Sequence, residues 1–318
     1  MNTAFMPVTL DLLDSYMTYF RATSCRSADY TFTNLWGWAD HYGLELSFRD
    51  DLCWIRQTRP FVQFWAPVGN WECADWDAHP EVHRGAILHR VPDELTVLLQ
   101  NRLGIERVVA QPIREQWEYL YSREELATLP GNRFHKKKNL VNQFRKLYGM
   151  DYRPLNWSMN PSGREDVLNL QEAWMQWRES GGAPSLQAEN DAILRVVNNW
   201  ERLPGLMGGS LYVENTMVAF AIGEPLDEHS LVLHFEKVLP GYKGVYQAIN
   251  NAMAVHAPES FTILNREQDL GEEGMRHAKE TYNPIGFLQK ETLNIAAAER
   301  RCPNRGKCRT YAHHEMNP

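Results

Sequence analysis

Residues Leu231 to Ala248 read Leu-Val-Leu-His-Phe-Glu-Lys-Val-Leu-Pro-Gly-Tyr-Lys-Gly-Val-Tyr-Gln-Ala. The first half of this stretch is rich in aliphatic and aromatic residues, which predicts a strand. Pro240, Gly241 and Gly244 then mark a turn that opens a helix. Such a turn can aim backbone N–H groups at a phosphate or a carbonyl, although an ordinary helix start needs no ligand. We therefore predict a strand, a glycine turn and a helix in a mixed α/β fold.

The residues around this stretch extend the same pattern of strands and helices. Two helices come first, and Val167, Leu170, Trp174 and Trp177 form one apolar stripe on the earlier of them. Glu214-Asn215 is predicted to be the hairpin turn between two strands. The predicted order is helices over 165–178 and 191–203, strands over 209–213, 217–224 and 230–238, a helix to about 255, a strand over 261–265, a helix over 272–282 and a strand over 287–293.

The first half of the chain shows a similar order of elements. Its opening 40 residues have helical spacing and contain the aromatic segment Tyr30-Thr-Phe-Thr-Asn-Leu-Trp-Gly-Trp38, which we interpret as core packing. The predicted elements that follow are strands over 43–48, 52–57 and 61–68, a helix over 93–103, a strand over 105–110, and helices over 122–129 and 132–146.

Composition sets limits on the class of protein. The chain has 318 residues, enough for two domains of ordinary size, and a formal net charge of −7, which argues against a surface that is basic overall. It contains no run of about 18 apolar residues, and Asp11 and Asp14 interrupt the N-terminal segment where a signal peptide would be apolar. We expect a cytoplasmic protein without an integral membrane segment, whose scattered cysteines are reduced thiols.

Several motifs together resemble known families. The strand, glycine turn and helix, followed by Tyr282-Asn-Pro-Ile-Gly-Phe287, resemble the acyl-donor half of the GCN5-related N-acetyltransferase (GNAT) fold. The segments 30–38, 131–144, 234–238, 241–250 and 265–279 in combination are similar to the phosphatidylglycerol lysyltransferase C-terminal domain family over roughly residues 5 to 295. The resemblance implies two tandem acetyltransferase-like domains, related to enzymes that move an amino acid from aminoacyl-tRNA to a lipid or a peptidoglycan precursor.

The expected domain division follows from this resemblance. We predict an N-terminal GNAT-like domain over 1–131, a basic connecting helix over 132–149, a C-terminal GNAT-like domain over 150–296 and a basic tail over 297–318. The membrane-bound lysyltransferases carry a long transmembrane portion that has no counterpart in this sequence, so modification of a lipid does not follow from the fold.

The expected donor site lies at the glycine turn. Its residues are Gly241, Tyr242, Lys243, Gly244, Val245, Tyr246 and Gln247. The donor is expected to be aminoacyl-tRNA or acyl-CoA, bound as a co-substrate and not as a tight cofactor. The turn lacks the full Gln/Arg-x-x-Gly-x-Gly/Ala pattern of acetyl-CoA enzymes, which counts against acetyl-CoA. An open turn favours an enzyme, whereas a turn plugged by Tyr242 or Tyr246 favours a binding protein.

Three residues are candidates for proton transfer. Strand alternation places His234 and Glu236 on one face and Leu231, Leu233 and Phe235 on the other, so either polar side chain could deprotonate an amine or a hydroxyl. The alternative is a structural salt bridge or a satisfied core histidine. The resemblance to acetyltransferases makes Tyr282 a candidate general acid, against the alternative of a tyrosine that packs at a helix end.

Two further groups are candidates for substrate binding. Asn265, Arg266, Glu267 and Asp269 follow a predicted strand, where they could bind a substrate or form a capping and ion-pair network. Residues 131–150 contain six basic residues and no acid, so Lys136, Lys137, Lys138 and Asn139 could contact tRNA or an anionic phospholipid through residues 133–146, unless they are only a solvated face.

The tail contains weak candidates for metal ligands. Cys302, Cys308, His313 and His314 are residue types that bind zinc, but their spacing lacks the tight C-x2-C pattern. We expect no metal there. The predicted function is acyl or aminoacyl transfer to an unidentified amine or hydroxyl, and the alternative is a non-catalytic protein that binds tRNA, a nucleotide or an anionic phospholipid.

Overall fold

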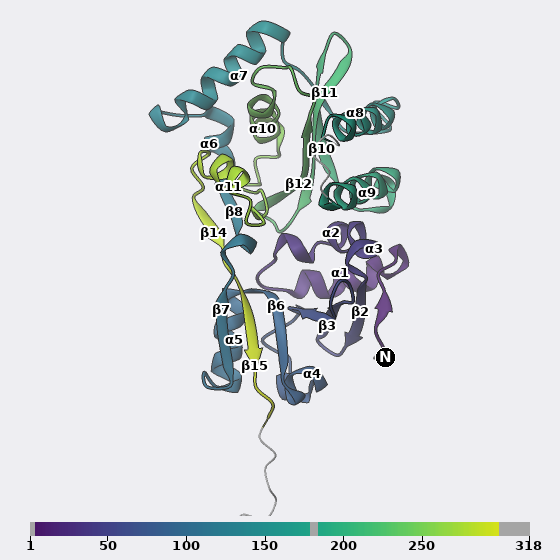
Figure 1. Ribbon diagram of the computed structural model, residues 1–318, viewed down its shortest axis with the longest axis vertical. Helices are drawn as coiled ribbons and strands as arrows, with labels where there is room; N and C mark the ends of the chain where they lie inside the picture. Colours follow the sequence, from purple (N-terminus) through teal and green to yellow (C-terminus); the bar gives the residue numbers. More distant parts are fainter. Residues whose placement is uncertain (1–3, 179–183, 299–318) are drawn as a thin grey trace, which may run out of the picture.

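Two mixed β-sheets lie one beyond the other along the long axis of the molecule (Figure 1). The computed structural model describes residues 4–178 and 184–298. The first sheet has eight strands in the order β1-β2-β3-β4-β6-β15-β7, with β5 paired to β3, and the second has seven in the order β14-β8-β13-β12-β11-β10-β9. The mixed α/β class predicted from the sequence is confirmed.

The first sheet and its helices form the lower part of Figure 1. Its strands are β1 (Met6–Pro7), β2 (Leu44–Arg49), β3 (Leu52–Gln57), β4 (Gln63–Trp65), β5 (Val68–Gly69), β6 (Ala86–Pro92), β7 (Val108–Pro112) and β15 (Lys290–Ile295). The accompanying helices are α1 (Leu13–Ala22), α2 (Phe32–Gly37), α3 (Ala39–Tyr42), α4 (Pro80–Arg84) and α5 (Asp93–Leu103). The strand predicted over 61–68 is thus two short strands.

The second sheet and its helices form the upper part of Figure 1. Its strands are β8 (Glu118–Ser122), β9 (Asp151–Pro154), β10 (Met207–Val213), β11 (Thr216–Pro225), β12 (Ser230–Val238), β13 (Ile263–Asn265) and β14 (Gly286–Leu288). The helices are α6 (Arg123–Thr128), α7 (His135–Tyr148), α8 (Gly163–Arg178), α9 (Pro184–Asn198), α10 (Val245–His256) and α11 (Glu273–Glu280). Glu214 and Asn215 form the predicted hairpin turn, with φ of 50° and 64°.

The two sheets exchange strands, so they do not follow a simple division at residue 131. The strand β8 pairs with β13 and β14 of the second sheet, although it precedes the predicted boundary. Conversely, β15 pairs with β6 and β7 of the first sheet. The single strand predicted over 287–293 is therefore two strands in different sheets, because the chain crosses from one sheet to the other at Gln289.

The apolar core runs through both sheets. Helices α8 and α9 cover one face of the second sheet, and α9 also contacts α2, where an added Cβ on Gly37 would lie 3.5 Å from Val196. Helices α7 and α10 cover the opposite face and enclose a second core. Trp174 is buried as predicted, but Trp177 is 50% exposed at the end of α8. The segment Tyr30–Trp38 packs mainly into the first core, which confirms its interpretation.

A buried network of charges joins the sheets where they exchange strands. The Lys290 ammonium is fully buried and donates to the carboxylates of Asp29 at 2.5 Å and Glu118 at 2.8 Å. Arg90 also pairs with Asp29, and Asn265 donates to Glu118. Burial by itself would raise the pKa of Asp29, but Arg90 and Lys290 outweigh it and lower the pKa to about 2. We call this set the junction network.

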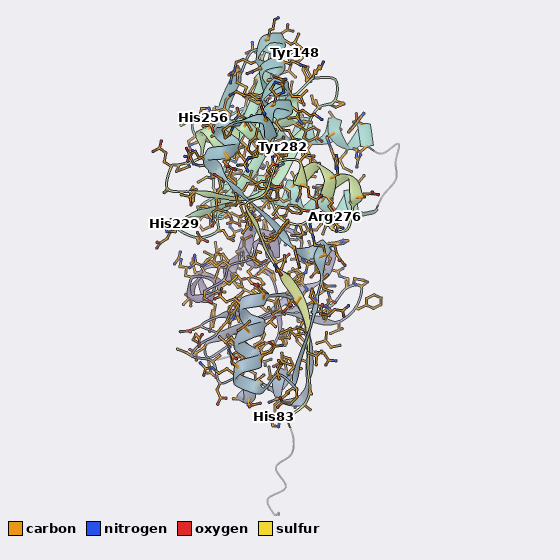
Figure 2. All side chains as sticks on the ribbon, turned by 90° about the vertical axis from the view of Figure 1, so that its left-hand side faces the viewer. His83, Tyr148, His229, His256, Arg276 and Tyr282 are labelled. Atoms are coloured by element: carbon orange, nitrogen blue, oxygen red, sulfur yellow. The ribbon has the colours of Figure 1, made fainter. Side chains whose placement is uncertain are left out.

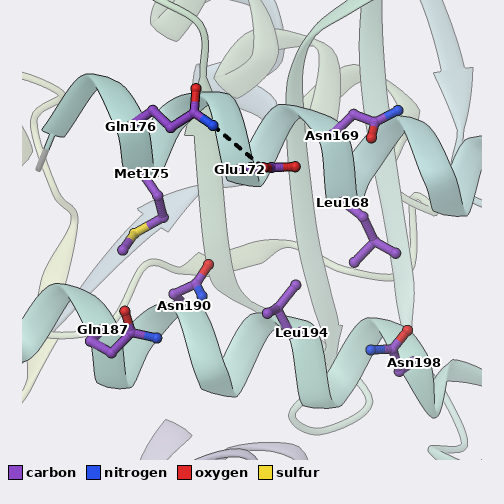
Figure 3. A pocket seen from close by; sticks show the side chains of 9 residues that line it. All are labelled: Leu168, Asn169, Glu172, Met175, Gln176, Gln187, Asn190, Leu194 and Asn198. Atoms are coloured by element: carbon purple, nitrogen blue, oxygen red, sulfur yellow. Dashed lines mark hydrogen bonds between the residues drawn. The ribbon is translucent and has the colours of Figure 1, made fainter.

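A groove of about 500 Å³ separates the outer sides of α8 and α9 (Figure 3). Amide side chains from both helices line it, and within it Gln176 donates to Glu172 at 3.3 Å. Asn190, one of these amides, accepts a hydrogen bond at 3.1 Å from Gln171, which is fully buried. The groove is open to solvent and faces away from the second sheet.

Candidate functional site

The strands β12 and β13 pair over only three residues and then separate. Their parallel ladder ends at Val232 opposite Asn265, whereas β12 continues to Val238. We call the place where the two strands part the splay. The glycine turn follows β12, and the loop 266–269 follows β13. Side chains from both connections therefore meet at the splay, as is usual at strand ends in α/β folds.

A β-bulge in β12 changes the predicted orientation of its side chains. Ile222 pairs with Phe235 and Gly223 pairs with Leu233, so His234 has no partner on β11. Leu231 and Leu233 consequently pack into the second core, while Phe235 packs into the first. The prediction that these three apolar residues share a face is wrong, because the bulge inserts one residue and shifts the alternation.

The bulge also places His234 and Glu236 in separate environments. The His234 side chain is fully buried between Glu224 at 2.9 Å and Glu267 at 2.7 Å. Burial would lower the pKa of this imidazole, but the hydrogen bonds to the two carboxylates raise it to about 9. The ring is therefore a cation at neutral pH, with both nitrogens in hydrogen bonds. This geometry argues against His234 as a general base and favours the structural alternative.

Glu236 instead faces a cluster of polar and aromatic side chains at the splay. Both carboxylate oxygens accept hydrogen bonds from the Arg266 guanidinium at 3.3 Å. The guanidinium carbon lies 5.1 Å from the Tyr282 ring centroid and 5.8 Å from that of Tyr121. With its amide oxygen turned toward the guanidinium, Asn250 of α10 accepts from it at 2.9 Å. Glu236, Arg266, Tyr282, Lys137 and Gln247 make up what we call the splay cluster.

Lys137 brings a second positive charge to this cluster. It points inward from α7, with its ammonium 4.0 Å from the Tyr282 ring centroid and 2.7 Å from the Thr281 hydroxyl. Burial and the neighbouring Arg266 lower the pKa of Lys137. Two cations therefore face the one carboxylate of Glu236, which leaves an excess of positive charge beside the splay.

Tyr282 lies in the interior of the second unit, just after α11 (Figure 2). Burial raises the pKa of its hydroxyl, the charge of Arg266 opposes this, and the side chain of Gln247 forms a hydrogen bond with it. The hydroxyl consequently carries its proton at neutral pH. A protonated phenol beside two cations can donate a hydrogen bond or a proton to a leaving group.

The glycine turn is packed against α7 on one side. An added Cβ on Gly244 would lie 2.3 Å from the Leu140 carbonyl oxygen, whereas one on Gly241 would meet nothing within 4 Å. The Tyr148 hydroxyl accepts a hydrogen bond from the Lys243 amide at 3.4 Å, and its ring contacts that of Tyr242. Gly244 is thus required because α7 packs against it. The turn is neither fully open nor plugged by Tyr242, whose ring lies against Tyr148.

The loop after β13 sends only one of its predicted residues into the splay cluster. Asn265 donates to Glu118 of the junction network, and Glu267 pairs with His234 and accepts from Asn34 at 2.9 Å. The fully buried Asp269 accepts from Tyr119 and Arg276. Arg276 appears in Figure 2 near the junction of the two units. Asn265, Glu267 and Asp269 therefore belong to internal networks of hydrogen bonds and ion pairs, and Arg266 alone reaches the cluster. The predicted capping role of Asp269 is wrong, because the N-cap residue of α11 is Glu272.

Lys279 holds this loop in place, a role that sequence reasoning missed. Its ammonium donates to the carbonyl oxygens of Arg266, Glu267 and Gln268 at 2.5, 3.1 and 2.6 Å. Burial lowers the pKa of Lys279 to about 8, and Arg266 adds to this effect. Helix α11 contains both acidic and basic residues, so its sequence does not indicate that Lys279 points inward; only the fold shows this. Tyr121 and Asn250 were missed for the same reason.

The basic helix presents two kinds of lysine. Lys136, Lys138 and Asn139 are exposed, whereas Lys137 turns into the splay cluster. Arg133 pairs with Glu125. The predicted group 136–139 is therefore split between the outer surface and the interior.

Residues 299–318 of the tail, with Cys302, Cys308, His313 and His314, lie outside the described residues. Within residues 4–178 and 184–298, no group of three or more His, Cys, Asp or Glu side chains is arranged to hold a metal ion. Cys25, Cys53 and Cys73 are free thiols. None of the helices in this part of the chain is both long and apolar enough to cross a bilayer.

The splayed strands, the glycine turn and the two mixed sheets define a protein of the GNAT-like fold class. The chain belongs to the family described as phosphatidylglycerol lysyltransferase, C-terminal, whose model matches residues 21–290.

Two solved structures share this fold, and a curated relative is similar in sequence over part of its length. A conserved protein of unknown function from Bacteroides thetaiotaomicron is 29% identical, with a TM-score of 0.80 over 92% of this chain and 99% of its own. L-PGS from Bacillus licheniformis is 12% identical, with a TM-score of 0.59 over 90% of this chain and 92% of its own. An uncharacterised protein of Mycoplasmoides gallisepticum is 23% identical over 178 residues, and the match spans 56% of either chain.

Proposed function

We propose that the protein transfers an aminoacyl or acyl group from a donor bound at the splay to an amine or hydroxyl of a second substrate. The observation that carries this proposal is the splay cluster, in which Arg266 and Lys137 face a single carboxylate beside a protonated tyrosine. An acyl transfer develops negative charge on the carbonyl oxygen, and fixed cations in a partly buried site stabilise that charge.

The proposed roles follow from the contacts. Glu236 accepts the proton of the attacking amine or hydroxyl, and Tyr282 donates a proton to the leaving oxygen or sulfur. Arg266 and Lys137 stabilise the oxyanion. Gln247 and Asn250 of α10 orient Tyr282 and Arg266. His234 has a positioning role, since it fixes Glu267 next to Arg266 and has both nitrogens engaged.

The packing of α7 favours aminoacyl-tRNA as the donor. The Tyr148 hydroxyl accepts a hydrogen bond from the Lys243 amide, and the Leu140 carbonyl lies close to Gly244. Helix α7 therefore occupies the side of the turn where a pyrophosphate would need free backbone N–H groups. The exposed Lys136 and Lys138 can contact tRNA phosphates on the outer side of the same helix. An anionic phospholipid is the alternative partner of this surface, and the family description makes a lipid one candidate acceptor.

A transfer assay with charged tRNA tests these roles. We expect Glu236→Gln and Tyr282→Phe each to slow transfer by about 10²- to 10⁴-fold, the usual range for loss of a general acid or base. Glu259→Gln, at an exposed position after α10, is the matched control. Normal rates in both variants, measured once an acceptor is known, would contradict the assignment of roles.

A non-catalytic binding protein is the second candidate function. The contact of α7 with the glycine turn favours it, because this contact narrows the expected donor site. Filter binding and thermal shift with charged tRNA, uncharged tRNA, acetyl-CoA and anionic vesicles separate the two candidates, since a bound ligand stabilises the folded state by mass action. Equal stabilisation by charged and uncharged tRNA, without transfer to any acceptor, would favour the binding protein.

A further inference from the structure

The groove between α8 and α9 opens on the outer side of the second unit (Figure 3). Its volume of about 500 Å³ lies within the range of sites that bind small ligands. Helices α8 and α9 cover one face of the second sheet, whereas α7 and α10, which carry Lys137 and Gln247 of the splay cluster, cover the other. The groove is therefore separate from the proposed catalytic site.

Amide and aliphatic side chains from both helices line the groove. Five of the lining residues are asparagine or glutamine, three are leucine or methionine, and Glu172 alone carries a charge. None of the described residues that line it is a lysine, an arginine or an aromatic residue. A phosphate would need a cation and a flat base would need an aromatic ring, so neither kind of ligand fits. The lining instead favours an uncharged or positively charged ligand with many hydrogen-bonding groups.

Two amides at the ends of the groove keep hydrogen-bonding groups free for a ligand. Gln176 donates through its amide nitrogen to Glu172 at 3.3 Å, and no residue among 4–178 and 184–298 donates to its oxygen. Asn198 accepts through its oxygen from Arg164 at 2.6 Å, and its nitrogen has no acceptor within the same ranges. The groove thus offers acceptors as well as donors, which is what a peptide backbone requires.

Gln171 orients a third amide, that of Asn190. The Gln171 nitrogen donates to the Asn190 oxygen at 3.1 Å, whereas the buried Gln171 oxygen has no hydrogen-bond partner in the described part of the chain. A buried oxygen without a donor lowers the stability of the folded protein and is rare. The contact with Gln171 occupies the Asn190 oxygen and leaves the Asn190 nitrogen for a ligand. An orienting role thus accounts for a glutamine at this buried position.

The groove has the length of a short extended peptide. Along α8 it runs from Leu168 to Gln176, which corresponds to a rise of about 12 Å. About four residues of extended chain span this distance. A peptide of that length carries several backbone donors and acceptors, which match the free amide groups of both helices.

We propose that the groove between α8 and α9 binds an extended peptide segment that contains a lysine or an arginine. The free amides pair with its backbone, Leu168 and Leu194 contact its apolar side chains, and Glu172 pairs with its cation. This inference goes beyond the proposed function and does not rest on it, because the groove and the splay cluster lie on opposite faces of the second sheet. Peptide binding can therefore be tested without a transfer assay.

Methyl NMR of the full chain, labelled with carbon-13 at the methionine methyl groups, tests the site. The probe is acetyl-Leu-Lys-Leu-Ala-amide, and acetyl-Leu-Glu-Leu-Ala-amide is the charge control of equal length. We expect the lysine peptide to shift the signal of Met175, which lines the groove, and to leave that of Met253 in α10 unchanged. The glutamate peptide should bind more weakly, since its carboxylate faces Glu172. An unchanged Met175 signal at saturating lysine peptide, or equal affinity for the two peptides, overturns the proposal.

Two substitutions test the individual contacts. Glu172→Gln, at an exposed position, should weaken binding of the lysine peptide about twofold to fivefold, the usual range for an exposed ion pair, and remove the preference over the glutamate peptide. Asn190→Leu removes the free nitrogen and should weaken binding of both peptides. Gln143→Ala, at an exposed amide of α7, is the matched control and should bind both peptides as the wild type does. Wild-type affinities in Glu172→Gln overturn the proposal, whether or not Asn190→Leu folds.

Discussion

The junction network and the splay cluster are both partly buried groups of charged side chains, but they differ in how completely they are satisfied. In the junction network, Lys290 lies between Asp29 and Glu118 at 2.5 and 2.8 Å and has no exposure to solvent. In the splay cluster, Arg266 reaches Glu236 only at 3.3 Å, and Lys137 contacts a hydroxyl and a ring but no carboxylate among the described residues.

The difference separates a structural role from a functional one. A buried ion pair is tolerated when short hydrogen bonds replace the lost hydration, as in the junction network. Unbalanced charge and long hydrogen bonds in a partly buried site lower the stability of the folded protein. Such an arrangement is typical of a functional site, where a bound ligand supplies the missing hydrogen-bond partners. The comparison predicts that changes in the junction network lower stability, whereas changes in the splay cluster mainly alter binding and catalysis.

The largest expected effect is that of Lys290→Met. Removing the ammonium leaves the buried carboxylates of Asp29 and Glu118 without their shared cation, which should lower the free energy of unfolding by about 3–5 kcal/mol. Urea denaturation measures this change. Lys138→Met, at an exposed position, should remain within about 0.5 kcal/mol of the wild type. A loss below about 1 kcal/mol for Lys290→Met would show that the network is not required for folding.

A smaller, pH-dependent effect is expected for His234→Asn. The pKa of His234 is raised to about 9 in the folded protein, so the stability contributed by its protonated ring is complete below the ordinary value of about 6.5. It is then lost as the pH rises through 9. The stability advantage of the wild type over the variant should therefore shrink between pH 6.5 and 9. Urea denaturation at three pH values measures it, with the exposed His229→Asn as control; a constant difference contradicts the charged state.

The smallest effect on stability is expected for Lys137→Met. Since burial and Arg266 already disfavour the charged form of Lys137, its removal should leave the thermal midpoint unchanged or slightly raised. Transfer should nevertheless slow, because one of the two cations facing the splay is lost. For the exposed Lys136→Met we expect the opposite result, an unchanged transfer rate at saturating donor but weaker tRNA binding. The slope of log binding constant against log salt concentration should be smaller in magnitude by about 0.9. Marked destabilisation by Lys137→Met would assign it a structural role.

The strand, glycine turn and helix over 231–248, the mixed α/β class and the family could all be predicted from the sequence. They depend on local propensity and on motifs of residues that are close in the chain. The sequence also singled out Glu236, Arg266, Lys137 and Tyr282, but as members of separate segments. It gave no means of choosing them over neighbours such as Asn265 and Asp269, which proved to be parts of internal networks.

Which charged residues contact one another depends on the tertiary structure. The bulge at His234 separates its partners from those of Glu236, and a one-residue insertion of this kind depends on pairing with β11, which no local pattern records. The exchange of β8 and β15 between the sheets likewise depends on contacts between residues distant in the chain. Nothing in the sequence distinguishes Lys137, Lys279 and Lys290 from lysines exposed to solvent. The packing of the helices and strands buries them, so that Lys137 joins the splay cluster, Lys279 holds the loop after β13 and Lys290 forms a buried ion pair.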